Sequence, residues 1–301
     1  MNQAIYMDYA ATTPIDGRVA KLMSRYMDFE GVFGNPASRT HEFGWQAEEA
    51  VENARVQVAK VLNADPREVV WTSGATESDN LAIKGLAEKT DKNHIITSKI
   101  EHKAVLDTCH FLEEKGFRVT YLQPDSKGCC SADQVKRALT EDTFIVSLMH
   151  VNNELGSVNN IANIAKLCSN QGVFFHVDAA QSFGKIPIDV RKLGIDMISI
   201  SAHKIYGPKG IGVLFVNRDS NIGLQPMIHG GGHEFGMRSG TLATHQIVGI
   251  GEAAELMFQE GEKDFEDHLR FREILLSSLN QIPDIQINSD FEKSIPSIIN
   301  V

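Results

Sequence analysis

The sequence of 301 residues has few cysteines, no excess of positive charge and no long apolar run. Its four cysteines form no C-x-x-C pair, so no disulfide framework is indicated and reduced thiols are expected. The formal net charge of −10 argues against a general nucleic-acid binder, which would present a basic face. No segment has the length of a membrane span, and the N-terminus lacks a signal-peptide pattern. We therefore expect a cytoplasmic protein that binds neither nucleic acid nor membranes.

Alternating secondary structure is the main feature of the chain from Glu68 onward. Short apolar runs predict strands at 69–72, 94–98, 118–122, 144–149, 173–178, 197–201 and 211–216. Helical spacing predicts helices at 15–29, 42–62, 81–89, 105–115, 161–171 and about 245–280. This order is typical of an α/β fold with a largely parallel sheet and helices on both faces. Ligands in such folds bind beyond the carboxyl ends of the strands.

The stretch from Met197 to Val216 carries the clearest chemical signal. Two apolar runs flank a Gly- and Pro-containing turn, and Ser201, His203 and Lys204 lie between them. A lysine at the end of a buried strand is unusual, because desolvating an ammonium is costly. For a lysine taken at random, a surface position with a buried stem is the commoner case. The alternative is a lysine of lowered pKa that forms a Schiff base with pyridoxal 5'-phosphate (PLP), beside a phosphate held by the serine and histidine.

A PLP site also needs a carboxylate for the pyridine nitrogen and more phosphate donors, and both precede Lys204. Asp178 ends a strand-like run, and its separation from Lys204 along the sequence suits one crossover between neighbouring parallel strands. Ala75, Thr76 and Glu77 follow a strand and a glycine, and would open a helix whose N–H groups favour a phosphate. Each signal alone is more typical of ordinary helix capping. Together and in this order they predict a PLP site.

These residues belong to motifs that resemble those of the cysteine desulfurases, PLP enzymes of the class V aminotransferase group. The resemblance covers essentially the whole chain and is greatest to the type that supplies iron–sulfur cluster assembly. The motifs are Y-M-D-Y-A-A-T-T-P, G-N-P-A-S, T-S-G-A-T-E-S-D-N, E-H-K-A-V-L, H-V-N-N-E-L-G, H-V-D-A-A-Q, S-A-H-K-I-Y-G-P-K-G-I-G and R-S-G-T.

The resemblance implies a fold, a domain division and an activity. The fold is that of the aspartate aminotransferase-like PLP-dependent transferases: a large α/β domain with a mostly parallel seven-stranded sheet, and a smaller, incomplete α+β domain. We expect the large domain at 15–258 and the small one at 1–14 and 259–301, with strands at 285–288 and 294–301. The implied reaction converts L-cysteine to L-alanine and passes the sulfur on as a persulfide. A homodimer and a sulfur-acceptor or scaffold protein are the implied partners.

The resemblance also assigns roles to residues in the matched motifs. Lys204 would carry the cofactor and move the proton at the substrate Cα, and Asp178 would pair with the pyridine nitrogen. His102 would stack on the ring and act as an acid or base, although a lone histidine is more often structural. Gln181 and Asn153 would lie at the ring hydroxyl, although such residues also favour turns and helix starts. The phosphate ligands would be Ala75, Thr76, Ser201 and His203, with Thr241 from the neighbouring subunit.

Two features depart from the family pattern. The family's persulfide-forming cysteine and its substrate-binding arginine lie in the C-terminal region, and none of Cys109, Cys129, Cys130 and Cys168 matches that cysteine. Phe235 stands where relatives commonly carry a basic residue. We therefore expect a chain shortened at its C-terminal end, which binds PLP but lacks the sulfur-accepting group. No catalytic metal is predicted, because no histidine pair has a trusted ligand spacing.

Two other functions remain open on these residues. One is a different class V PLP lyase or aminotransferase, which acts on another amino acid. The other is an inactive PLP-binding subunit that dimerises with a complete partner.

Overall fold

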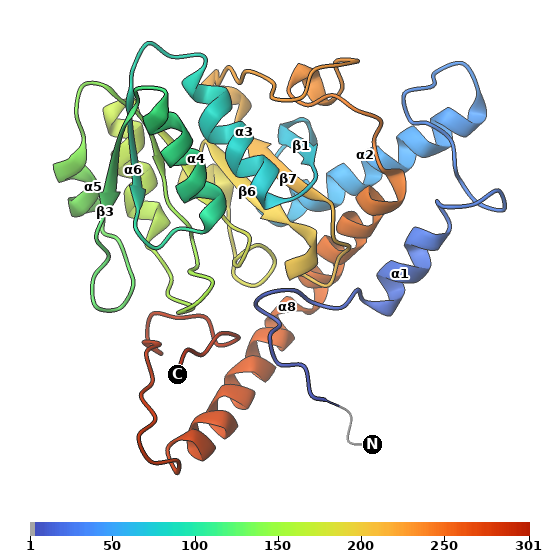
Figure 1. Cartoon of the computed structure of the whole chain (residues 1–301). Helices are drawn as coiled ribbons and strands as arrows, with labels where there is room; N and C mark the ends of the chain where they lie inside the picture. The colour runs from blue at the N-terminus through green and yellow to red at the C-terminus, as the bar shows by residue number, and fades with distance from the viewer. Residues whose placement is uncertain (1–3) are drawn as a thin grey trace.

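A seven-stranded sheet runs through the centre of the computed structural model, which describes residues 4–301 (Figure 1). Its strands are β1 (Val69–Thr72), β2 (His94–Ser98), β3 (Arg118–Leu122), β4 (Thr143–Ser147), β5 (Phe174–Asp178), β6 (Met197–Ser201) and β7 (Gly212–Val216). Their order across the sheet is β1-β7-β6-β5-β4-β2-β3. Strand β7 runs antiparallel to β1 and β6, and the other neighbours are parallel. The mostly parallel sheet predicted from the sequence is confirmed.

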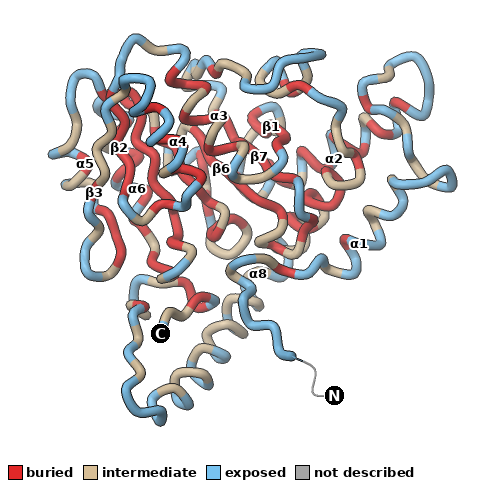
Figure 2. The backbone as a smooth tube through the Cα atoms, in the orientation of Figure 1, coloured by how far each residue is buried: buried red, intermediate tan, exposed pale blue. Residues whose placement is uncertain are grey.

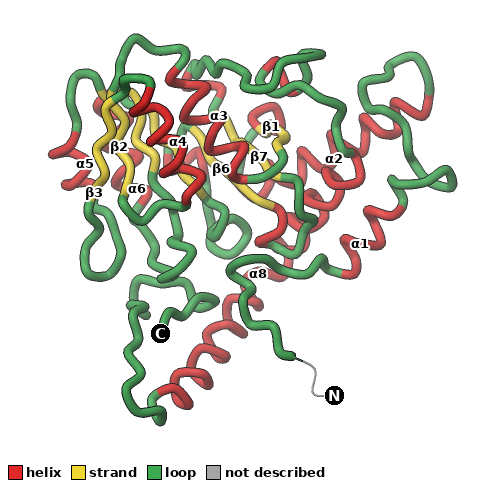
Figure 3. Tube along the Cα trace, in the orientation of Figure 1, coloured by secondary structure: helices red, strands yellow, loops and turns green. Residues whose placement is uncertain are grey.

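Helices cover both faces of this sheet (Figures 1 and 3). The helices are α1 (Gly17–Ser24), α2 (Glu42–Leu62), α3 (Ala75–Ala87), α4 (Lys103–Glu114), α5 (Ala132–Ala138), α6 (Ile161–Gln171), α7 (Val190–Leu193) and α8 (Thr244–Leu279). Short 3₁₀ turns occur at η1 (Pro66–Glu68), η2 (Ala202–Lys204), η3 (Arg218–Ser220) and η4 (Glu234–Gly236). Helices α3 and α4 pack on one face, and α2, α6 and the first half of α8 belong to the core on the other.

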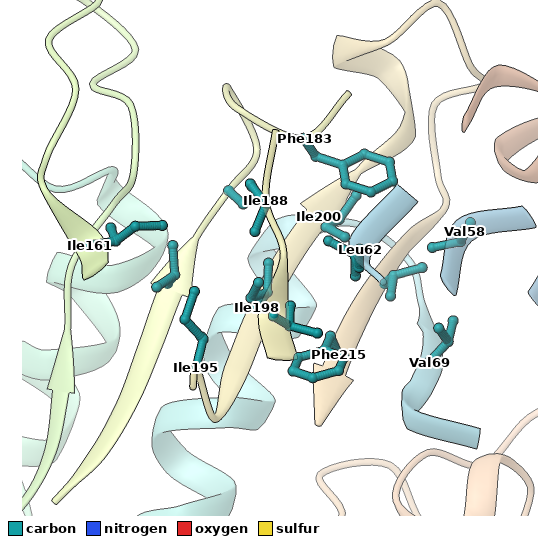
Figure 4. Packing of buried hydrophobic residues seen from close by; sticks show 14 of the residues in the cluster. Val58, Leu62, Val69, Ile161, Phe183, Ile188, Ile195, Ile198, Ile200 and Phe215 are labelled. Atoms are coloured by element: carbon teal, nitrogen blue, oxygen red, sulfur yellow. The ribbon is translucent and has the colours of Figure 1, made fainter. Parts of the chain in front are cut away.

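The alternation of side chains along each strand explains the two cores. On β1, Val69 and Trp71 join the core of α2 and α8, whereas Val70 joins the core of α3 and α4. The central strands are buried on both faces, as their continuous apolar runs indicate (Figure 2). Figure 4 shows the larger core, where Phe215 of β7 lies near Ile198 of β6.

The chain ends differ from the prediction. The described residues 4–16 form no strand, and the helix expected at 15–29 is only α1, because Gly31 and the turns before it interrupt the helical spacing. The strands expected at 285–288 and 294–301 are absent as well. Instead Ser294 makes one isolated bridge with Ser157, and Ile295 and Ile298 pack on Val151. Alternating apolar residues here serve a small side-chain cluster and not a sheet.

The division into a large and a small domain stays a prediction, and its residues 1–3 lie outside the described part. Helix α8 leaves the sheet and extends toward the segment that holds the C-terminus (Figure 1). No helix among residues 4–301 combines the length and apolarity needed to cross a membrane.

Candidate active site

A cavity of about 890 Å³ lies at the carboxyl ends of β1, β5 and β6. Its position agrees with the rule for open α/β sheets. All the predicted site residues except Thr241 line it: Ala75, Thr76, His102, Asn153, Asp178, Gln181, Ser201, His203 and Lys204. Thr241 is exposed and does not line the cavity of its own chain.

One end of the cavity is formed by the start of α3. Gly74 is the N-cap of this helix, with φ +154°, and no side chain caps the first turn. The N–H groups of that turn are therefore available to an anion at the cavity wall. The turn also needs the glycine at the start of β7, because a Cβ on Gly212 would lie 2.6 Å from Gly74 Cα. Two backbone segments thus touch where the helix begins.

At this end of the cavity the negative charge of Glu77 is balanced by an ion pair with Arg238. Glu77 in the first turn of α3 accepts hydrogen bonds from Arg238 Nε at 2.9 Å and from Ser73 N at 2.6 Å. Burial by itself would raise the pKa of Glu77, but these hydrogen bonds outweigh it and lower the pKa below the ordinary value. Arg238 therefore keeps this carboxylate from repelling a bound anion.

The other end of the cavity contains Lys204. Its Nζ donates to the carbonyl oxygens of Ala10 at 2.6 Å and Ala11 at 2.8 Å. Burial lowers the pKa of Lys204, and the charges of Asp178 and Asp8 partly oppose this. A lysine that loses its proton more readily is suited to covalent attachment of a carbonyl cofactor.

The N-terminal segment is tied to the turn that carries Lys204. The backbone N–H and the hydroxyl of Thr13 both donate to His203 O, and Tyr206 N donates to Thr13 Oγ1. The Nδ1 atom of His203 lies 3.1 Å from Thr12 Oγ1. Burial lowers the pKa of His203 to about 4, so its ring is neutral near pH 7. The N-terminal segment therefore lies beside the site.

Asp178 and His102 form the walls between the two ends. Asp178 ends β5, and its Oδ1 accepts from Ala180 N at 2.9 Å. Burial raises its pKa, whereas the Ala180 N–H, His102 and Lys204 lower it. His102 is the N-cap of α4, and its Nδ1 accepts from Ala104 N at 3.1 Å. Because Nδ1 is an acceptor, the ring proton of neutral His102 is on Nε2.

A buried polar row lies behind Asp178. His176 on β5 is 2.8 Å from Ser147 Oγ on β4 and 2.9 Å from Ser199 Oγ on β6. Burial lowers the pKa of His176 to about 3, so this imidazole is neutral. Asp79 of α3 lies 3.6 Å from His176 Nε2, and neither of its carboxyl oxygens has a hydrogen-bond partner among residues 4–301. Burial, and next the charge of Asp178, raise the pKa of Asp79 well above its ordinary value.

Four residues at or behind the cavity wall were not predicted from the sequence. Ala10 and Ala11 line the cavity and hold Lys204 by their carbonyl groups. Asp79 and Glu101 are buried outside it, and burial raises the pKa of Glu101 to about 8. The S-D-N sequence after the Thr76 turn offered one signal, because it places an aspartate on the face of α3 that packs on the sheet. The contacts of residues 10 and 11 had no local signal.

The four cysteines are all within the described residues, and none of them lines the cavity. Each is buried, and burial raises the pKa of each thiol. They are thus inert by position and by protonation. Phe235 lies over the guanidinium of Arg55 at 5.6 Å, outside the cavity.

The chemistry of the cavity fits PLP. A lysine of lowered pKa, a buried carboxylate and a helix start without a side-chain cap all line one space. These groups suit a carbonyl carbon, a pyridine nitrogen and a phosphate respectively. The fold and the site therefore define a PLP-dependent enzyme of the α/β type.

Comparison with known proteins places the chain more narrowly. The family model for aminotransferase class-V matches residues 5–301. Cysteine desulfurase IscS from Shewanella loihica is 58% identical over 303 residues, which cover all of this chain and 75% of that protein. A structure described as a NifS-like protein is 39% identical, with a TM-score of 0.93, over 98% of this chain and 80% of that one. The structure of SspA in complex with cysteine is 50% identical, with a TM-score of 0.80, over 84% and 72% of the two chains. The chain belongs to the aminotransferase class-V family, and within it to the cysteine desulfurases.

Proposed function

We propose that this chain is a PLP-dependent cysteine desulfurase, which converts L-cysteine to L-alanine and passes the sulfur to a thiol for iron–sulfur cluster assembly. The observation that carries this function is the meeting of Lys204, Asp178 and the start of α3 in one cavity. The cysteine bound to the similar SspA structure supports the substrate. In the overall reaction, L-cysteine and a thiol give L-alanine and a persulfide, so atoms and electrons balance without a further oxidant.

The residues at the two ends of the cavity would hold the cofactor. Thr76, Ser201 and His203, with the N–H groups of α3, would bind its phosphate. Asp178 would accept a hydrogen bond from the pyridine nitrogen and keep that nitrogen protonated. When bound, PLP withdraws electrons from the bonds at the substrate Cα.

Three other side chains would act on the substrate and the ring. Lys204 Nζ would take and return the proton at the substrate Cα, for which its lowered pKa is suited. The Nδ1 atom of His102 is engaged by Ala104 N, so Nε2 is the ring nitrogen that would exchange a proton with the substrate. Asn153 would lie at the ring hydroxyl with Gln181, and both line the cavity.

The thiol that accepts sulfur has to reach the cavity from elsewhere, because no cysteine among residues 4–301 lines it. A small thiol or a protein thiol would serve, and a sulfur-acceptor or scaffold protein is the partner we propose. Alanine release by residues 4–301 should therefore depend on added thiol.

A homodimer is the second proposed partnership. Thr241 would reach the phosphate in the neighbouring subunit, since it is exposed and away from the cavity of its own chain. Exposed aromatic rings of the loop before α2 and of its first turn support an interface. Phe29 stacks on Phe33, Phe33 contacts Phe43 of α2, and all three are exposed. Sedimentation of the purified protein would test this association.

The experiment that tests the function is a spectrum of the protein with PLP, before and after addition of L-cysteine and dithiothreitol, together with an alanine assay. We expect a visible band that changes with cysteine, alanine release, and loss of both in Lys204→Ala. A band that does not depend on Lys204 would contradict the proposal. Turnover of selenocysteine or of a keto acid, with none of cysteine, would instead assign the chain to another class V activity. PLP binding without turnover, and stable association with a full-length relative, would indicate an inactive subunit.

A further inference from the structure

Lys185 is a partly buried amine that the proposed reaction does not use. It lies on the turn after β5, four residues beyond Gln181, and its Nζ donates to Gln181 Oε1 at 3.0 Å. An enclosed ammonium is costly unless its hydrogen bonds are satisfied. A lysine next to a residue at the cavity wall therefore calls for a physical explanation.

The backbone fixes the two side chains on one side of the same turn. Phe183 N donates to Ala179 O and Ile186 N donates to Ser182 O, so the segment is a series of hydrogen-bonded turns. The contact between Lys185 Nζ and Gln181 Oε1 lies within these turns. The ring of Phe183 anchors the turn in the core near Ile200 (Figure 4).

Helix α8 closes the turn from the other side. Gly184 has φ +73°, and a Cβ there would lie 3.0 Å from the Cβ of Met257 on α8. The glycine therefore allows both the left-handed conformation and the close approach. Lys185 is left between this helix and Gln181, where Asp264 and His268 of α8 also line the small space around it.

The charge of Lys185 decides which end of the Gln181 amide faces it. An ammonium only donates hydrogen bonds, so it selects the carbonyl oxygen of the amide and directs the NH₂ group the other way. In the structure Gln181 Nε2 donates to Ala10 O at 2.8 Å, the same oxygen that accepts from Lys204. The two contacts therefore favour the same orientation of the amide, and without the ammonium only the contact with Ala10 O would hold it.

Lys185 has three titratable neighbours, namely Lys204, Asp264 and His268. Burial, and next the charge of Lys204, lower the pKa of Lys185 to about 8. His268 and Asp264 approach it from α8. With a pKa of about 8, most of Lys185 is protonated at pH 7, so it remains a donor there.

We propose that Lys185 is a positioning residue, which fixes the Gln181 amide so that its NH₂ group faces the cavity and the N-terminal segment. This inference rests on the proposed function only where the cofactor is concerned. With PLP bound, the fixed NH₂ group would donate to the ring oxygen of the cofactor. Without the cofactor it holds Ala10, and through it the N-terminal segment, beside Lys204.

The first test uses the protein without cofactor and measures hydrogen exchange of the peptide that covers residues 8–13. In Lys185→Met the Gln181 amide loses the donor on its oxygen, so its NH₂ group is held less firmly beside Ala10 O. We expect exchange in this peptide to become about fivefold faster, the size of one neutral hydrogen bond. Lys185→Arg keeps a donor and should restore the slow exchange. Equal exchange in Lys185→Met and the parent protein would overturn the contact.

The second test follows the visible absorbance of the holoenzyme against pH. A donor to the ring oxygen stabilises its negative charge, so loss of the donor moves the spectral transition to higher pH. We expect an upward shift of about one pH unit in Lys185→Met, as one charge-assisted hydrogen bond predicts. The same substitution in a Gln181→Ala background should cause no further shift, because Lys185 acts through Gln181.

The outcomes separate this inference from the proposed function. A shift of equal size in both backgrounds would mean that Lys185 acts directly by its charge, and would overturn the positioning role. A parent protein without any visible band would refute the proposed function. The exchange experiment would in that case still decide whether Lys185 orients Gln181.

Discussion

The two ends of the cavity are built in different ways. The phosphate end is mostly local: β1, the turn at Ser73 and Gly74 and the start of α3 follow one another in the sequence. The lysine end joins segments far apart in the chain, since Lys204 donates to Ala10 and Ala11 and Gln181 contacts both Lys185 and Ala10. A helix start can therefore bind an anion through its own backbone N–H groups. A reactive lysine instead needs tertiary contacts, which set its pKa and the orientation of its side chain.

The largest expected effect is a loss of kcat, and it should occur at the lysine end of the cavity but not at the phosphate end. Lys204→Ala should lower kcat for alanine formation by more than about 1,000-fold, because the proton at Cα loses its carrier. Thr76→Ala should leave kcat within about tenfold and mainly weaken PLP binding, since backbone N–H groups still hold the phosphate. Steady-state kinetics at saturating PLP would measure both. Comparable losses of kcat in Lys204→Ala and Thr76→Ala would contradict these separate roles in catalysis and cofactor binding.

A backbone contact of the phosphate end can be broken by one methyl group. Gly212→Ala would place a Cβ 2.6 Å from Gly74 Cα and in a clash with Ile200 O. We expect the free energy of unfolding to fall by about 2–3 kcal/mol, because overpacking forces the backbone apart. Urea denaturation would measure it.

Gly223→Ala is the matched control, because no atom lies within 4 Å of a Cβ at that position. Its effect on urea denaturation should be within about 0.5 kcal/mol, as for most surface substitutions. A loss as large as that of Gly212→Ala would show that the tight approach at Gly74 is not the cause.

A charge at the phosphate end gives a smaller effect. Arg238→Met would leave Glu77 without its ion pair, and the carboxylate would face the phosphate of PLP. We expect the Kd for PLP to rise about tenfold, equivalent to roughly 1.4 kcal/mol. Equilibrium dialysis with the apoprotein would measure this Kd.

The double variant Arg238→Met with Glu77→Gln is the control for this charge effect. Its affinity should return toward that of the parent, because the repelling carboxylate is gone. No recovery in the double variant would instead mean that the arginine itself attracts the phosphate.

A test of a different kind concerns pH and the buried carboxyl group of Glu101. The folded-state pKa of Glu101 is raised to about 8 from 4.5, so the folded protein binds more protons than the unfolded one between these values. The stability that this group contributes is present below pH 4.5 and is lost as the pH rises toward about 8. Glu101→Gln should remove up to about 1.4 kcal/mol per pH unit from this slope. Thermal unfolding between pH 5 and 8 would show it, and an unchanged slope would contradict the raised pKa.

Most of the sheet could be predicted from the sequence, because the central strands are short, continuous apolar runs. It also predicted the start of α3, since a strand, a glycine and a polar residue form a local pattern. It was wrong at 285–288 and 294–301, where alternating apolar residues pack on Val151 without a partner strand. Strand pairing needs a neighbouring edge, and a short stretch of sequence does not contain that edge.

What the sequence determined by itself is the class of the protein and the chemical identity of its site. Lys204, Asp178 and the turn before α3 were recognisable because each lies at or just after the end of a strand, and strand ends meet at one edge of a parallel sheet. What only the tertiary structure decided is the environment of those groups: the carbonyls that hold Lys204 and the ammonium of Lys185 on Gln181. These contacts arise between distant segments, and their burial, which shifts pKa values and fixes amide orientation, exists only in the folded chain.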